Sequence, residues 1–195
     1  MGDLRVGQEK FQQYVERCKE LGVQDAKIIS VKDVVVMEEW VRFKCQFGCE
    51  EYGQHLTCPP HLPGFSECKN TVLCYNSGIL LKFTETETNN TMEKYNNYKN
   101  KLRKIMARLE RQIFLEGYHK VISLHSGPCT LCETCVIQGK QIEGIPKCRK
   151  YKVSRPAMEA MGISVFDTVR NVGWETKILN SFHDIHTYYG LLLIE

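Results

Sequence analysis

Apolar residues recur at helical spacing in two long segments of the chain. The first stripe is Phe11, Tyr14, Val15, Cys18 and Leu21. The second stripe is Tyr95, Tyr98, Leu102, Ile105, Leu109 and Ile113. Gly22 and Gly117 are placed to end the two helices, and Asn90 with Glu93 forms a capping box before the second. The pattern therefore predicts two amphipathic helices, of which the second is the longest in the chain.

Short apolar runs bounded by turn residues predict strands between and after these helices. The runs lie at 26–31, 34–37, 78–84, 119–125 and 187–194. A shorter helix is expected at 65–75, and Ser154 and Ser164 are placed as caps of two more, with Gly162 and Gly173 ending them. Strands that alternate with helices predict an α/β chain, more specifically an α+β sandwich with a mixed central sheet of about 4–5 strands flanked by helices.

Length and composition indicate one soluble domain over residues 1–195. The chain is 43% hydrophobic and 25% charged, which is typical of a globular protein with a core that needs no disulfides. A net charge of +3, without interleaved aromatic and basic residues, argues against nucleic-acid binding. No apolar run approaches the roughly 20 residues of a membrane helix, and no secretion signal is present. We therefore expect a cytoplasmic protein that binds neither nucleic acid nor membrane.

Four of the ten cysteines lie in one loop, at about 127–153, with spacing suited to a metal–thiolate centre. They are Cys129, Cys132, Cys135 and Cys148. Ten cysteines in a reducing compartment indicate metal binding or redox chemistry rather than cross-links. Each iron corner of a cuboidal cluster takes one thiolate, so C-x2-C-x2-C with one remote cysteine favours a [4Fe-4S] cluster. Structural zinc sites more often use two separated C-x2-C pairs, and zinc is the alternative.

Basic residues are frequent around this second cysteine loop. They are Lys140, Lys147, Arg149, Lys150, Lys152 and Arg155. Four thiolates around a cluster core of about +2 leave a net charge of about −2, which such residues could offset. Arg149 and Arg155 are the strongest candidates, whereas the others are more simply solvated. Ser154 could donate a hydrogen bond to the same centre.

A second group of cysteines, Cys45, Cys49 and Cys58, occupies an upstream loop at about 45–64. Pro59 follows Cys58 directly, as proline follows a ligating cysteine in ferredoxin-type runs, and it favours an extended conformation for Cys58. Three cysteines make an incomplete set of metal ligands. A closed set would make an electron carrier or a structural site, whereas an open position permits binding of substrate or water.

The fourth position of the upstream site has three candidates in the sequence, His55, His61 and Cys68, besides remaining open. A loop histidine is more often solvated than a ligand. Cys68 shares a helical face with apolar residues, and Cys18 lies on the apolar stripe of the first helix. Core packing is therefore the expectation for both of these cysteines.

Both cysteine loops resemble a family of predicted metal-binding proteins of unknown function, found mainly in anaerobic bacteria and archaea. The matching residues are Cys45, Cys49, Tyr52-Gly53, Cys58-Pro59-Pro60, Gly127-Pro128-Cys129, Cys132, Cys135, Cys148, the segment 155–163 and Val165-Phe166. The likeness spans about 28 to 194 and implies iron–sulfur or other metal binding without an established reaction. Cys148 is followed by Arg149 rather than by the proline sometimes found after a last ferredoxin ligand.

The sequence thus leads to three hypotheses of function. The first is an iron–sulfur protein with one or two [4Fe-4S] clusters, ligated at the second loop and at the upstream cysteines, that transfers electrons to a redox partner protein. The second is an enzyme in which substrate binds an exposed iron at the three-cysteine site. The third is a zinc-bound structural or interaction module. The residues leave open whether the protein is an enzyme.

Overall fold

A four-stranded sheet lies at the centre of the computed structural model, which describes residues 3–86, 91–138, 144 and 146–195, with side chains from Phe11 onward. Its strands are β1 (Asp25–Ser30), β2 (Ser77–Thr84), β3 (Ile122–Leu124) and β4 (Thr187–Leu193), in the order β1-β2-β4-β3. The α+β class is confirmed. All three strand pairings are antiparallel, however, so the expectation of a mixed sheet was wrong. Over the residues described, parallel pairing occurs in an isolated bridge between His125 and Ala157.

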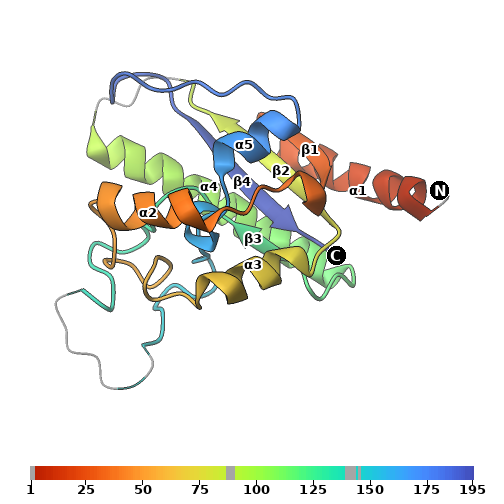
Figure 1. Cartoon of the computed structure of the whole chain (residues 1–195). Helices are drawn as coiled ribbons and strands as arrows, with labels where there is room; N and C mark the ends of the chain where they lie inside the picture. The colour runs from red at the N-terminus through yellow and green to blue at the C-terminus, as the bar shows by residue number, and fades with distance from the viewer. Residues whose placement is uncertain (1–2, 87–90, 139–143, 145) are drawn as a thin grey trace.

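Helices cover both faces of the sheet, as the ribbon shows (Figure 1). On one face lie α1 (Asp3–Glu20) and α4 (Met92–Leu115); on the other lie α2 (Glu38–Gly48), α3 (Phe65–Leu73) and α5 (Val165–Asn171), with the single turns η1 (Val31–Asp33) and η2 (Glu159–Met161). Successive strand residues point to opposite faces. Ile79 and Leu192 therefore pack with α1 and α4, while Leu80 and Leu191 pack with α3 and α5. The result is the expected sandwich with two apolar cores.

The two long helices predicted from periodicity are confirmed. Leu109 and Ile113 are almost fully buried, so the predicted stripe of α4 faces the sheet. At the start of α4 the Thr91 hydroxyl accepts the Lys94 backbone N–H at 3.2 Å. The predicted cap, Asn90, lies outside the described residues.

Several shorter elements differ from the prediction. Residues 34–37 form no strand; Val36 makes one isolated bridge to Ile163, and α2 begins at Glu38. The strand expected at 119–125 spans only Ile122–Leu124. The helix expected after Ser154 is the single turn η2, which ends at Gly162 with a positive φ of 84°. A Cβ at Gly162 would lie 2.4 Å from the Phe65 ring, so glycine allows α3 to pack closely there.

The two cysteine groups lie at one end of the sandwich. Cys45 lies within α2 and Cys49 directly follows it, so the predicted start of the upstream loop at residue 45 was wrong. The second loop leaves the sheet after β3 and runs through turns and bends from Cys129 onward. The loops meet, since the Gln138 side-chain amide donates to the Gln54 side-chain oxygen at 3.4 Å. Within the described part of the chain, no helix has the length and apolar character to cross a membrane.

Candidate metal centre

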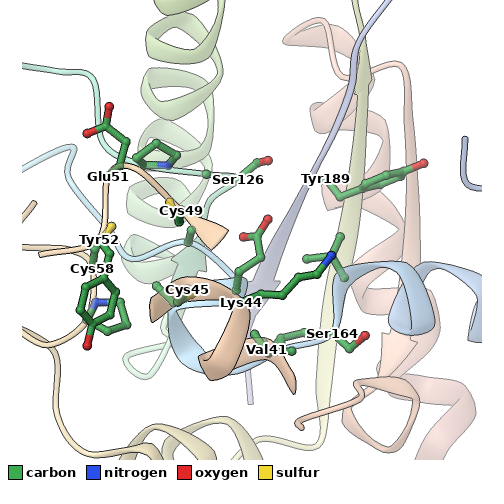
Figure 2. Close-up of a pocket in the computed structure, with 18 of the residues that line it drawn as sticks. Val41, Lys44, Cys45, Cys49, Glu51, Tyr52, Cys58, Ser126, Ser164 and Tyr189 are labelled. Carbon is green, nitrogen blue, oxygen red and sulfur yellow. The ribbon is translucent and has the colours of Figure 1, made fainter. Parts of the chain in front are cut away.

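The three upstream cysteines open onto one cavity of about 440 Å³. Cys45 stands one helical turn after Val41 on α2 and one turn before Cys49, so α2 presents these side chains on one face. Cys58 comes from the following loop. Figure 2 shows the three cysteines toward one side of the cavity, with Tyr189 on the other. Ligand pockets commonly have about 300–1,000 Å³, so the cavity has the size of a small-molecule site.

Apolar and aromatic side chains form most of the cavity wall. They include Trp40, Val41, Tyr52, Pro59, Pro128, Ile163, Val165, Phe166 and Tyr189. Burial raises the pKa of the Cys58 thiol to about 12, and the neighbouring Cys49 adds to this effect. Burial likewise raises the pKa of the Cys45 thiol. Because a bound cation stabilises thiolates, metal binding there would reverse these shifts.

The proposed fourth ligands of this site do not line its cavity. The ring of His55 is hydrogen-bonded to the Glu51 carboxylate at 2.7 Å and borders the second cysteine site instead. The exposed ring of His61 contacts the Gly53 carbonyl at 3.2 Å. Cys68 is 1% exposed in the apolar core, where its thiol donates to the Pro63 carbonyl at 3.3 Å. The cavity thus gathers three cysteines without any of the three predicted additional donors.

All four cysteines of the second loop line another, much smaller cavity. It measures about 20 Å³ and is also bordered by His55, Leu56, Thr57, Leu131, Val136, Arg149, Lys150 and Ser154. The Cys129 sulfur lies 3.7 Å from the Ser154 hydroxyl, in line with the predicted contact. The structure therefore brings together the remote Cys148 with the C-x2-C-x2-C run.

The side chains of each cysteine group do not converge on a single point. Among the residues that the structure describes, no three His, Cys, Asp or Glu side chains converge closely enough to hold one ion. Four sulfurs bound to one tetrahedral zinc would lie about 3.8 Å apart, given a Zn–S distance of about 2.3 Å. The cysteines of the second loop share a cavity in a more open arrangement.

Two buried cations of α4 lie behind the cysteine loops. Lys99 is 3% exposed and Arg103 is 1% exposed. Arg103 Nη2 donates to the carbonyls of Ser126, Gly127 and Pro128 at 3.3, 3.0 and 2.5 Å, the three residues before Cys129. Its Nε and Nη1 atoms are buried without a hydrogen-bond partner among the residues that the structure describes. Arg103 therefore fixes the entry to the second loop and keeps part of its bonding capacity unused.

The electrostatic surroundings of these cations include thiols from both groups. Arg103 interacts with Cys129 and with Cys58, and Lys99 interacts with Cys129. Burial, with Arg103 adding, lowers the pKa of Lys99 to about 8. Burial raises the pKa of Glu159, whose carboxylate borders the larger cavity near both cations.

Of the six basic residues singled out near the second loop, two have assignable roles. Arg149 donates to the Thr134 carbonyl and borders the small cavity, so its role in offsetting negative charge stays a prediction. Arg155 instead forms a forked ion pair with Glu110, with Nη2 to Oε1 at 2.5 Å, so its charge is already neutralised. Lys140 lies outside the described residues.

Four residues at the site were not found by sequence reasoning. Glu51 and Glu159 border the larger cavity, and Lys99 and Arg103 lie behind it. A signal for the cations was present, because Tyr95, Lys99 and Arg103 follow one another at i, i+4 and i+8 beside the apolar stripe of α4. Because the structure buries both charges, they need a compensating partner.

The fold and the two cysteine groups define a cysteine-rich α+β protein that is equipped for metal binding. The chain belongs to the family described as "predicted metal-binding protein" (DUF2284), which it matches over residues 27–194. The matched span includes both cysteine groups, so the family description and the cysteines together imply a bound metal. No curated protein and no solved structure matched the chain.

Proposed function

We propose that the protein is an iron–sulfur protein in which Cys129, Cys132, Cys135 and Cys148 ligate a [4Fe-4S] cluster and a redox partner protein exchanges electrons with it. The observation that supports this proposal is the single small cavity that all four cysteines line. A cluster bound there would supply one-electron transfer at a potential set by charge, hydrogen bonds and burial.

The donor set and its setting fit such a cluster. A cavity of about 20 Å³ holds little more than one water molecule, so a cluster requires the loop to move outward. The four cysteines lie in irregular backbone rather than in helices or strands, so this movement breaks no regular element. Each corner of a cuboidal cluster takes its own thiolate, which agrees with sulfurs that share a cavity without converging on one ion.

Surface charge around the second loop favours an acidic redox partner. Lys147, Lys150 and Lys152 are exposed beside the four-cysteine cavity. Complementary charge speeds the encounter of two proteins and orients them. We place this reaction in the cytoplasm, where a reducing environment keeps the cysteines out of disulfides and available as metal ligands.

The three-cysteine site supports a second candidate function, an enzyme that binds a small molecule at an open metal position. The supporting observation is the 440 Å³ cavity bordered by Cys45, Cys49 and Cys58. His55, His61 and Cys68 do not complete the ligand set there. A metal held by three thiolates and facing a cavity would offer its free position to a ligand.

Purification without oxygen, followed by metal analysis and visible absorption, tests the main proposal. We expect a brown protein with about four irons per occupied site and broad absorbance near about 400 nm. A colourless protein that contains one or two zinc ions would contradict the iron–sulfur proposal and favour the structural module.

A Cys58→Ala variant separates the carrier from the enzyme. If the four-cysteine centre alone transfers electrons to the partner, the variant loses metal at the upstream site but still reduces a chemical acceptor. If the upstream metal binds substrate, the variant also loses the spectral change that added ligands produce in the wild type. A matched Cys74→Ala variant, which alters an exposed cysteine outside both sites, keeps both properties.

A further inference from the structure

We infer that Lys99 and Arg103 form one buried counter-charge shared by the two cysteine sites, and that this pair raises the reduction potential of the clusters bound there. The inference rests on the proposed iron–sulfur function. It assigns to α4 a role in setting redox properties, in addition to its packing against the sheet.

The first reason for this inference is that both cations are buried without an ion-pair partner among the described residues. Lys99 and Arg103 are 3% and 1% exposed, and among the described residues neither forms an ion pair. Buried charges are ordinarily paired or bound to an ion of opposite charge, because an isolated buried charge is costly. Two adjacent buried cations therefore indicate that an anionic group is held nearby in the functional protein.

The position of the pair identifies the anion as metal-bound thiolate. Arg103 binds the carbonyls of residues 126–128, which border the upstream cavity and directly precede Cys129 of the second group, so it lies beside both sites. Its Nε and Nη1 atoms have no hydrogen-bond partner in the described part of the chain. Lys99 approaches the same loop at Gly127, where a Cβ would lie only 2.9 Å from the Lys99 Nζ. A [4Fe-4S] cluster with four thiolates carries a net charge of about −2 and would complete this arrangement.

Other charged groups do not cancel the pair. The Glu159 carboxylate offsets at most one of the two positive charges. Glu51 also interacts with Lys99, but its half-exposed side chain lies in solvent, which screens its charge, and it is hydrogen-bonded to His55. Burial, reinforced by Arg103 and Arg155, lowers the pKa of His125 far below its usual range, so this buried ring is neutral. Positive charge therefore remains in excess behind the loops.

The sign of the effect follows from electrostatics. Reduction adds one negative charge to a cluster, and a nearby cation stabilises the reduced form more than the oxidised form. Replacing a cation with a neutral side chain should therefore lower the reduction potential. Arg103 should affect both sites, whereas Lys99 should act mainly on the second.

Redox titration of the oxygen-protected protein, followed by electron paramagnetic resonance, tests these expectations. Lys99→Met should shift the signal of the four-cysteine centre to lower potential. Arg103→Met should lower the potential of both centres, and Arg103→Lys should restore values near those of the wild type. A Lys101→Met variant is the matched control, because Lys101 is an exposed residue on the same helix.

The variants also separate charge from structure. If Arg103 served only to hold the carbonyls of residues 126–128, Arg103→Lys and Arg103→Met would both contain less metal and both show a lowered reduction potential. That result would overturn the inference. If the Arg103 variants fail to fold, Lys99→Met provides the test. A reduction potential of the four-cysteine centre equal to that in Lys101→Met would contradict the shared counter-charge. A wild type that contains zinc alone would overturn the proposed function and this inference with it, whereas a brown wild type with unshifted variants would overturn this inference only.

Discussion

Burial separates two kinds of cysteine in this chain. Cys18 and Cys68 are 0% and 1% exposed within the apolar cores, whereas all seven candidate ligands are at least partly exposed. Burial raises the pKa of Cys18 to about 12, so this residue behaves as an apolar thiol. Local sequence predicted the core role of both cysteines, because each lies among apolar residues at helical spacing. That prediction is confirmed.

Single alanine substitutions of cysteine test this division directly. Cys132→Ala should remove the metal of one whole site, because a missing corner ligand destabilises the bound centre. Cys18→Ala should retain the metal of both sites and lose only packing. Metal content per protein after oxygen-free purification measures the difference. Equal metal loss from the two variants would show that the division into ligands and core residues is wrong.

A glycine at position 127 allows the close approach of Lys99 to the second loop. Its φ is +61°, a conformation that costs other residues about 1–2 kcal/mol, and a Cβ would crowd the Lys99 ammonium. Gly127→Ala should therefore destabilise the protein by this backbone cost and by a smaller further amount, because only the end of the flexible Lys99 side chain has to shift. Gly22→Ala is the control, because Gly22 has a φ of +89° with nothing within 4 Å of a Cβ. Equal unfolding free energies in urea for the two variants would contradict the contact.

Among the elements, those set by repeated local patterns were predicted well. The long helices have apolar stripes of about three and about five turns, so no single contact decides them. The prediction of a strand at 34–37 was wrong because the backbone N–H groups there bond to groups outside the sheet. Val35 N–H donates to the Thr168 hydroxyl at 3.0 Å, and Met37 N–H donates to the Gly162 carbonyl at 2.9 Å. Contacts with a segment far along the chain replace strand pairing there.

Helix α2 was missed although its sequence carried a signal. The spacing C-x3-C places Cys45 and Cys49 one helical turn apart, and Val41 lies one turn earlier. Proline and glycine farther along the segment suggested a loop from residue 45. The outer face of α2 exposes Phe43 and Phe47, whose rings lie 4.8 Å apart, so its apolar pattern does not have one buried side.

A polar contact links α1 to the end of α4 and makes a prediction about pH. Glu116 accepts a hydrogen bond from Tyr14 at 2.6 Å and pairs with Arg17, and hydrogen bonding to Arg17 holds the pKa of Glu116 below its ordinary value of about 4.5. Glu116→Gln should retain the tyrosine bond but lose the ion pair, at a cost of at most about 1 kcal/mol because the pair is partly exposed.

The sign of the pH effect follows from the lowered pKa. The stabilisation is complete above pH 4.5 and is lost as pH falls through the pKa of folded Glu116. The difference in unfolding free energy between wild type and Glu116→Gln should therefore shrink in acid. Urea unfolding at stepwise lower pH measures it, with the exposed loop residue Glu175 replaced by glutamine as the control. A difference that persists unchanged in acid would contradict the ionic contribution.

For the molecule as a whole, the sequence identified both cysteine groups and, because each adjoins a predicted strand of one sheet, suggested that the two loops meet, but it could not predict which residues make the contact. That contact depends on residues far apart in the chain, such as Gln54 with Gln138 and Arg103 with both thiol groups. No local periodicity encodes such pairs. The cavity beside the upstream cysteines could not be predicted from the sequence either. Its volume of about 440 Å³ is enclosed by α2 together with residues from 126–128, 157–166 and 187–189, which are far apart in the chain.

The contact between the loops predicts that metal at the second site stabilises the first. Residues 55–57 form part of the wall of the four-cysteine cavity, so the loss of metal there should loosen the neighbouring backbone. In Cys132→Ala we expect faster hydrogen exchange at the amides of Gly53 and Cys58, which bond to the Pro59 and His55 carbonyls at 3.0 and 2.9 Å. Amides of β2 at the centre of the sheet should keep wild-type protection, and Cys18→Ala should leave the upstream loop unchanged. Faster exchange confined to residues 127–153 would show that the two loops respond independently.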